Sequence, residues 1–130
     1  MIRRVFLAFL VFGLVACGDD GVSPENPIIG TWEFESIMGD GVTAEPTTWT
    51  FTRTTLTVVA TAADCTETAN YTLDDDGTLT YTFTAVDGLD CDGVVGAVIT
   101  GFTATVSADT LTLVFQERGV AFTVLFKRVN

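Results

Sequence analysis

Threonine alternates with apolar residues along much of this chain, and this alternation constrains the fold more than any other feature. Residues 48–52 (TWTFT) and 78–84 (TLTYTFT) show it plainly. Residues two apart lie on the same face of a β-strand, so these segments predict half-buried antiparallel strands with threonine on the wet face. From residue 17 onward, no helical period of useful length is present.

About eight such strands are expected, joined by short connections. They cover residues 30–38, 47–53, 55–62, 66–74, 78–86, 95–107, 110–116 and 120–128. The connections at 74–77 (DDDG), 107–109 (SAD) and 117–119 (ERG) have the composition of tight hairpin turns. Short turns make consecutive strands neighbours, and closure removes exposed sheet edges. The chain therefore predicts an all-β, antiparallel up-and-down barrel, with a two-sheet β-sandwich as the alternative.

The first 27 residues differ in composition from the strand region and divide into two segments. In 1–16, Arg3 and Arg4 precede an apolar run of about a dozen residues, which is typical of a secretory signal peptide. The run is too short for the hydrocarbon core of a bilayer, which needs roughly 20 residues. In 17–27, acids, glycines and prolines surround one large apolar residue, which predicts a flexible tether. Residues 28–130 then form one domain.

Residues 14–17 (LVAC), at the end of the apolar run, resemble the lipobox of bacterial lipoproteins. The resemblance implies cleavage before Cys17, acylation of that cysteine, with palmitate among its chains, and anchoring in the bacterial cell envelope. Gly18, with aspartate only later, is similar to the pattern of lipoproteins sorted to the outer membrane. The alternative is an ordinary signal peptide that ends on a chance cysteine.

The charge balance limits the classes of partner. The chain carries 6 Lys and Arg against 17 Asp and Glu, a formal net charge of −11. Nucleic acid and anionic lipid surfaces both attract basic patches, so neither is expected as an electrostatic partner. Contact with the membrane is therefore expected through the lipid on Cys17, without help from surface charge.

Cys65 and Cys91 remain as an even pair once Cys17 is acylated. In an exported protein such a pair favours a disulfide, and closing this loop would stabilise the fold by ~3.5 kcal/mol on the chain-entropy model. Two free thiols are the alternative. The chain has no histidine, so the usual base for a cysteine or serine nucleophile is missing. We expect no enzymatic activity and no cofactor.

Residues 29–34 (IGTWEF), at the start of the first expected strand, resemble the Gly-x-Trp opening of lipocalins and of small lipocalin-like lipoproteins of bacteria. In that family the tryptophan plugs the closed end of the barrel, and a basic residue of the last strand lies across its ring. The resemblance implies these roles for Gly30, Trp32, and either Lys127 or Arg128. A cation–π contact of this kind contributes about 0.5–2 kcal/mol.

An eight-stranded barrel either fills its interior with side chains or leaves room for one small ligand. Inward positions of the expected strands carry many aromatic rings. A cavity among them would be slim and wholly apolar, and it would suit a small hydrophobic molecule. The residues expected to line it are Trp49, Phe51, Tyr71, Tyr81, Phe83, Phe102, Phe115 and Phe122. If the rings instead fill the interior, the barrel is a structural or protein-interaction module of the envelope.

The segment 87–93 (DGLDCDG) is a second candidate site. Asp87, Asp90 and Asp92 offer oxygen ligands that suit calcium. The spacing does not fit the twelve-residue EF-hand loop, and aspartate and glycine are also what a tight loop needs. The sequence leaves both interpretations open, and we predict no metal site.

Lipidation at Cys17 is directly testable. The variant Cys17→Ser should fail to incorporate a radiolabelled palmitate, because the serine hydroxyl does not replace the thiol that the resemblance assigns to acylation. The measurement compares labelling and membrane fractionation of the variant with those of the natural chain. Equal labelling and equal membrane association of the two proteins would show that the anchor lies elsewhere.

Overall fold

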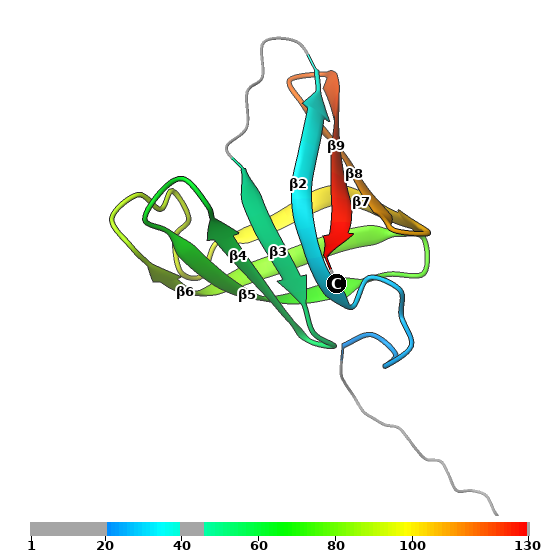
Figure 1. Cartoon of the computed structure of the whole chain (residues 1–130), viewed down its shortest axis with the longest axis horizontal. Helices are drawn as coiled ribbons and strands as arrows, with labels where there is room; N and C mark the ends of the chain where they lie inside the picture. The colour runs from blue at the N-terminus through cyan, green and yellow to red at the C-terminus, as the bar shows by residue number, and fades with distance from the viewer. Residues whose placement is uncertain (1–20, 40–45, 130) are drawn as a thin grey trace, which may run out of the picture.

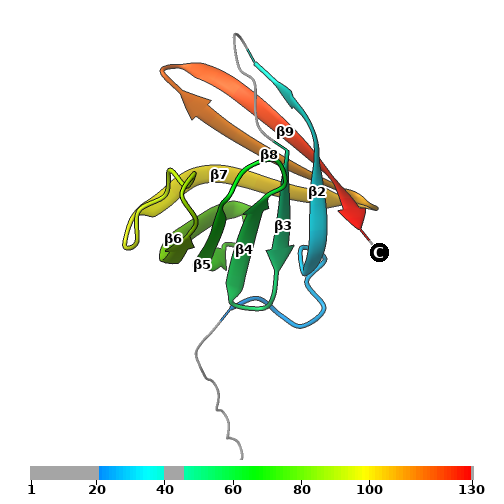
Figure 2. The same cartoon turned by 60° about the vertical axis from the view of Figure 1, so that its left-hand side comes forward.

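The computed structural model describes residues 21–39 and 46–129, which form a closed antiparallel barrel (Figures 1 and 2). Its strands are β2 (Gly30–Met38), β3 (Thr47–Phe51), β4 (Thr55–Ala60), β5 (Thr66–Leu73), β6 (Thr78–Asp87), β7 (Val98–Ser107), β8 (Thr110–Glu117) and β9 (Val120–Val129). Each strand pairs with the next in sequence, and β9 returns to pair with β2. The predicted up-and-down barrel is confirmed, and the chain does not form the alternative β-sandwich.

Alternation along each strand separates the inside of the ring from the outside. In β8, Leu111 and Leu113 are 0% and 1% exposed, whereas Thr112 between them points outward and is partly exposed. The register places Leu111 opposite Phe126 of β9, so apolar side chains from neighbouring strands meet on the same inner face. The largest fully buried side chains are Trp32, Phe51, Phe126, Ile28, Leu56, Leu79, Leu111 and Leu113.

The three predicted hairpin turns are present. The turn between β5 and β6 is closed by a hydrogen bond from the Gly77 N–H to the Asp74 carbonyl at 2.9 Å. Between β8 and β9, Arg118 and Gly119 have φ of 54° and 79°. Two successive positive φ angles match the right-handed twist of a two-residue hairpin. These turns keep β5 beside β6, β7 beside β8, and β8 beside β9.

Trp32 closes one end of the barrel, which we call the closed end. Its side chain is 0% exposed, and its indole Nε1 donates to the Ile28 carbonyl at 2.9 Å. The Arg128 guanidinium carbon lies 4.2 Å from the centroid of the ring. The structure thus places Arg128, rather than the exposed Lys127, over the tryptophan.

Gly30 allows the arginine to take this position. Its φ is 138°, which disfavours other residues, and a Cβ there would lie 2.9 Å from Nη1 of Arg128. The guanidinium also donates to the carbonyls of Ile29 and Pro27, at 3.3 and 2.9 Å, and pairs with Asp109 at 3.5 Å. One side chain of β9 therefore fastens the start of β2 and the segment before it.

That segment differs from the flexible tether expected for residues 17–27. The Val22 side chain is only 7% exposed, its N–H donates to the Arg53 carbonyl at 2.9 Å, and its own carbonyl accepts from Arg53 Nε at 3.1 Å. Ile28 is fully buried. The segment is too polar to build a core of its own. It is held in place by the one buried valine and by backbone hydrogen bonds to the turn between β3 and β4. Residues 17–20 lie outside the described residues.

Truncation of Trp32 tests the packing of the closed end. Trp32→Ala should lower the free energy of unfolding by about 3–5 kcal/mol, as for other buried aromatic truncations. Thr105→Ala, at an exposed position of β7, serves as the control and should change it by less than about 0.5 kcal/mol. Urea unfolding followed by circular dichroism gives both values. A loss below about 1 kcal/mol for Trp32→Ala would contradict its role as the plug.

Candidate functional site

The half of the barrel opposite Trp32 is hollow, and we call this end the open end. A chamber of about 490 Å³ lies between the inward side chains of seven strands. Its lining residues are Phe34, Ile37, Thr47, Trp49, Val58, Tyr81, Asp92, Phe102, Leu113, Phe115, Val124 and Phe126. The chamber therefore lies toward the open end, on the far side of the buried side chains that pack around Trp32.

Aromatic rings that pack against one another form much of the chamber wall. The Trp49 ring lies 5.1 Å from the Phe126 ring and 6.0 Å from the Tyr81 ring, and its Nε1 donates to Thr47 Oγ1 at 3.0 Å. On the other side, the centroids of Phe102 and Phe115 are 4.9 Å apart. Edge and tilted contacts of this kind hold rings in defined positions, so the wall has a fixed shape.

A second hollow of about 420 Å³ continues from the chamber toward the connection between β6 and β7. The two hollows share Thr47, Val58, Tyr81 and Asp92 in their walls. The second is also lined by Ala60, Cys65, Glu67, Phe83, Asp90, Gly93, Val94, Ala97 and Ile99. Chamber and second hollow therefore adjoin each other, and we call the two together the cleft.

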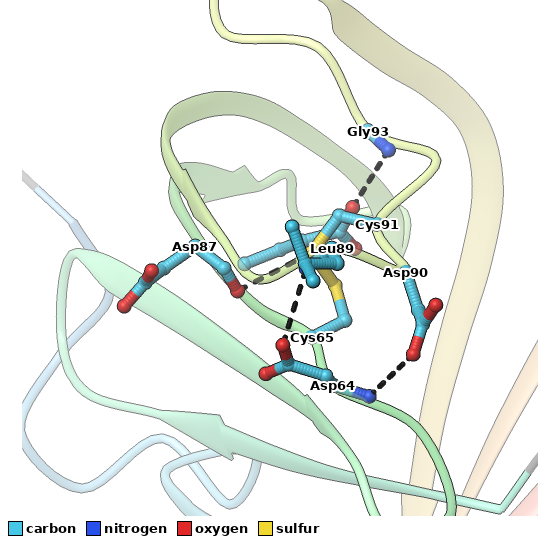
Figure 3. The surroundings of a disulfide bond; sticks show 8 residues. Asp64, Cys65, Asp87, Leu89, Asp90, Cys91 and Gly93 are labelled. Atoms are coloured by element: carbon cyan, nitrogen blue, oxygen red, sulfur yellow. Dashed lines mark hydrogen bonds between the residues drawn. A yellow bond between two sulfur atoms is a disulfide. The ribbon is translucent and has the colours of Figure 1, made fainter.

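The disulfide Cys65–Cys91 fixes one side of the cleft (Figure 3). It joins the start of β5 to the loop 88–97 across a sequence separation of 26. Asp64 strengthens the link, because its N–H donates to Asp90 Oδ2 at 2.9 Å and its Oδ2 accepts from the Leu89 N–H at 3.3 Å. The predicted disulfide is confirmed, and together with these hydrogen bonds it holds the loop against the start of β5.

Glu67 and Gly93 make a second link between the same two segments. The Gly93 N–H donates to Glu67 Oε2 at 2.8 Å (Figure 3). A Cβ on residue 93 would lie 2.3 Å from that oxygen, so a side chain there would displace the Glu67 carboxylate from this position. The backbone at residue 93 therefore sits against the carboxylate, and the neighbouring Asp92 reaches the cleft.

Tyr81 occupies the junction of the two hollows. Its side chain is 7% exposed, and no described residue lies within hydrogen-bonding distance of its hydroxyl in a suitable geometry. Burial, together with the negative charge of Glu67, raises the pKa of Tyr81 to about 12. The phenol is therefore neutral in the physiological pH range and offers both a donor and an acceptor to the cleft.

The expected cavity-lining residues divide into two groups. Trp49, Tyr81, Phe102 and Phe115 line the chamber, and Phe83 lines the second hollow. The other three are packing residues: Phe51, Tyr71 and Phe122 are 1%, 3% and 7% exposed and line neither hollow.

The expectation of a wholly apolar cavity is wrong, since Thr47, Glu67, Asp90 and Asp92 reach the cleft. Two of these, Asp90 and Asp92, belong to a loop placed by the disulfide, and Glu67 is one of the few acids within a strand. Phe34, Leu113, Val124 and Phe126 also line the chamber. Strand alternation is enough to predict that these four side chains point inward. Alternation does not show which inward side chains face the chamber and which are packed in the core.

The three aspartates proposed as calcium ligands do not come together. Asp90 bonds to the backbone of Asp64, and Asp87, Asp90 and Asp92 form no shared group within the described residues. Cys65, Glu67 and Cys91 do have ligand atoms within 4.8 Å of one another. Both sulfurs are joined in the disulfide, so this group does not fit a metal ion.

Comparison with known proteins places the barrel in a family. A family model described as a lipocalin-like domain matches residues 28–125. The chain belongs to this lipocalin-like family. No curated protein and no solved structure matches it. In this lipocalin-like barrel, residues 21–39 and 46–129 contain no helix long and apolar enough to cross a membrane. Cys17, the candidate lipidation site, lies outside the described residues.

An alkaline titration tests the burial of the tyrosines in this lipocalin-like barrel. The chain has only two, Tyr71 and Tyr81, so few phenols contribute to the signal. Burial raises the pKa of each to about 12, whereas a phenol in the unfolded chain titrates near pH 10. The native state then holds protons that the unfolded state has lost. The free energy of unfolding should therefore be unaffected below about pH 10 and fall as the pH rises toward 12.

Ultraviolet absorbance of the phenolate provides the measurement. In the native protein both phenolates should appear only near the alkaline unfolding transition, and in urea they should titrate near pH 10. Phenolate formation near pH 10 in a chain that keeps its native circular dichroism would show that the rings are not buried.

Proposed function

We propose that this chain is a lipid-anchored protein of the bacterial envelope whose barrel binds a small hydrophobic molecule in the cleft, without catalysis. The observation that carries the binding role is the chamber of about 490 Å³, walled mainly by aromatic and aliphatic side chains. Small-molecule sites commonly measure about 300–1,000 Å³ and have walls of this composition. Membership of the lipocalin-like family supports the same function.

The chamber suits a slim ligand. Its wall contains two packed pairs of rings, Trp49 with Phe126 and Phe102 with Phe115, which occupy much of the space inside the barrel. Binding would be driven by apolar contact, at about 25 cal/mol per Å² of buried surface. An alkyl chain or a small aromatic molecule meets this requirement.

The position of the anchor gives the barrel an orientation. Val22 is bonded to Arg53 at the closed end. Cys17 precedes Gly21 by four residues, which span at most about 14 Å when fully extended. A lipid on Cys17 would therefore hold the closed end near the membrane, and the cleft would open away from it.

A second function, as a protein-interaction module, has one observation in its favour. Apolar side chains near the cleft are exposed: Leu89 is 93% exposed, Val94 67% and Val98 59%. Exposed apolar groups that gather in patches mark interaction surfaces in many soluble proteins. The two functions differ in whether the cleft itself is occupied by a small molecule.

Ligand titration separates them. In the full, oxidised chain carrying Cys17→Ser, no protein-bound acyl chain competes for the chamber, and Trp32→Phe leaves Trp49 as the single tryptophan reporter. A panel of neutral alcohols and small aromatic molecules should quench Trp49 and raise the melting temperature, because the ligand binds the native state.

A chamber-filling variant provides the specificity control. Val124 lines the chamber, so Val124→Phe should weaken binding about tenfold or more, equivalent to about 1.4 kcal/mol. Val114→Phe adds the same ring to β8 at a position between the inward Leu113 and Phe115, and it should leave affinity unchanged. Absence of quenching and of any thermal shift across the panel would favour the interaction module.

A further inference from the structure

The charged groups that line the cleft are all negative. Glu67, Asp90 and Asp92 line it, and no Lys or Arg does so in the described part of the chain. Arg53 and Arg128 lie at the closed end. Arg118, in the turn between β8 and β9, is exposed and lines neither hollow. The cleft is therefore a site of negative potential.

Asp92 is the carboxylate best placed to meet a ligand. It lines both hollows and is exposed to solvent. Asp90 and Glu67 each accept a backbone hydrogen bond, at 2.9 and 2.8 Å, whereas no described residue donates to the Asp92 carboxylate. The loop 88–97 therefore places the Asp92 carboxylate at the cleft, and no hydrogen bond of the loop depends on that carboxylate.

Tyr81 supplies an independent observation that points to a ligand. Its hydroxyl is the polar end of a side chain that is 7% exposed, and it has no hydrogen-bond partner among the described residues. A buried hydroxyl without a partner costs free energy. Tyr71 shows the contrast, since its hydroxyl donates to the Thr52 carbonyl. The phenol of Tyr81 is therefore poised to bond to a molecule in the cleft.

We propose that the ligand is a cationic amphiphile, a primary or secondary amine with an apolar tail, whose ammonium group bonds to Asp92 and Tyr81. This inference rests on the proposed function of the cleft. The tail would lie in the chamber against Trp49 and Phe102. An ammonium group donates hydrogen bonds to the carboxylate and to the phenol oxygen, and nearby aromatic faces add cation–π attraction.

Other head groups fit less well. An anionic head would lie close to Glu67, Asp90 and Asp92 with no cation of the cleft to compensate it, and the repulsion between like charges is unfavourable. A neutral alcohol would satisfy Tyr81 and would leave the negative charge of Asp92 without a counterion. The ammonium group alone complements both side chains.

A matched series of octyl compounds tests the head group. n-Octylamine, 1-octanol and octanoate share one tail and differ in charge at neutral pH. Quenching of Trp49 in the full oxidised chain carrying Cys17→Ser and Trp32→Phe gives the three affinities. We expect the amine to bind at least about tenfold tighter than the alcohol, octanoate to bind most weakly, and the advantage of the amine to shrink as salt is added.

Charge-neutralising variants show which carboxylate gives the amine its advantage in affinity. Asp92→Asn should remove most of the advantage of the amine and leave the affinity for 1-octanol unchanged. Asp75→Asn removes the same charge from an exposed turn at the closed end and should change neither affinity. Tyr81→Phe removes only the hydroxyl and should weaken the amine severalfold. Thermal melts of each variant establish that the fold is retained.

The outcomes distinguish this inference from the function on which it rests. If no octyl compound binds and the neutral panel also fails, the proposed function is wrong. If 1-octanol binds as tightly as the amine, the cleft is a hydrophobic site and the cationic head group is rejected. An equal loss of amine affinity in Asp75→Asn and Asp92→Asn would attribute the preference to net charge, and it would overturn the assignment to Asp92.

Discussion

The pairing of β2 with β9 is the contact on which the rest of this structure depends. It turns a meander of hairpins into a ring, and only a ring gives each strand an inner face that is closed off from solvent. Arg128 secures the pairing, because its guanidinium covers Trp32 and bonds to the backbone of the segment before β2. Trp32 plugs one end in this way, and the cleft lies toward the other.

Much of the fold was predictable because alternation of apolar and polar residues is a local property. The strands and the three hairpin turns follow from threonine spacing and from residues such as Gly77 and Gly119. The ordered segment around Val22 was not predictable, since its place depends on hydrogen bonds to Arg53, 31 residues away. The same holds for the loop 88–97, whose position is set by the disulfide and by the bond between Glu67 and Gly93.

The candidate site was likewise predictable in its local features and not in those that depend on distant contacts. Alternation identifies which aromatic residues point inward, but it does not distinguish Phe51 from Phe115. Depth along the barrel separates them: Phe51 packs near the plug, whereas Phe115 faces the chamber. Tyr81 was expected to line the cavity and Asp92 was named as a possible calcium ligand, but alternation and spacing do not show that the two face one cleft. In the described structure neither side chain has a hydrogen-bond partner, whereas Tyr71 and Asp90 each have one.

The separation of β2 from β9 in sequence also affects how the chain folds. All other neighbouring strands are joined by direct connections, whereas Thr31 pairs with Val129 and Arg128 bonds to Ile29 across 99 residues. Hairpins along the chain form from local contacts, but contacts over so long a separation form slowly, because a large loop must close first. The strand that completes the ring, β9, is synthesised after the seven strands that form the ring with it. The cleft therefore exists only after the whole of β9 is available, and loss of Arg128 would remove the contact that secures the closure.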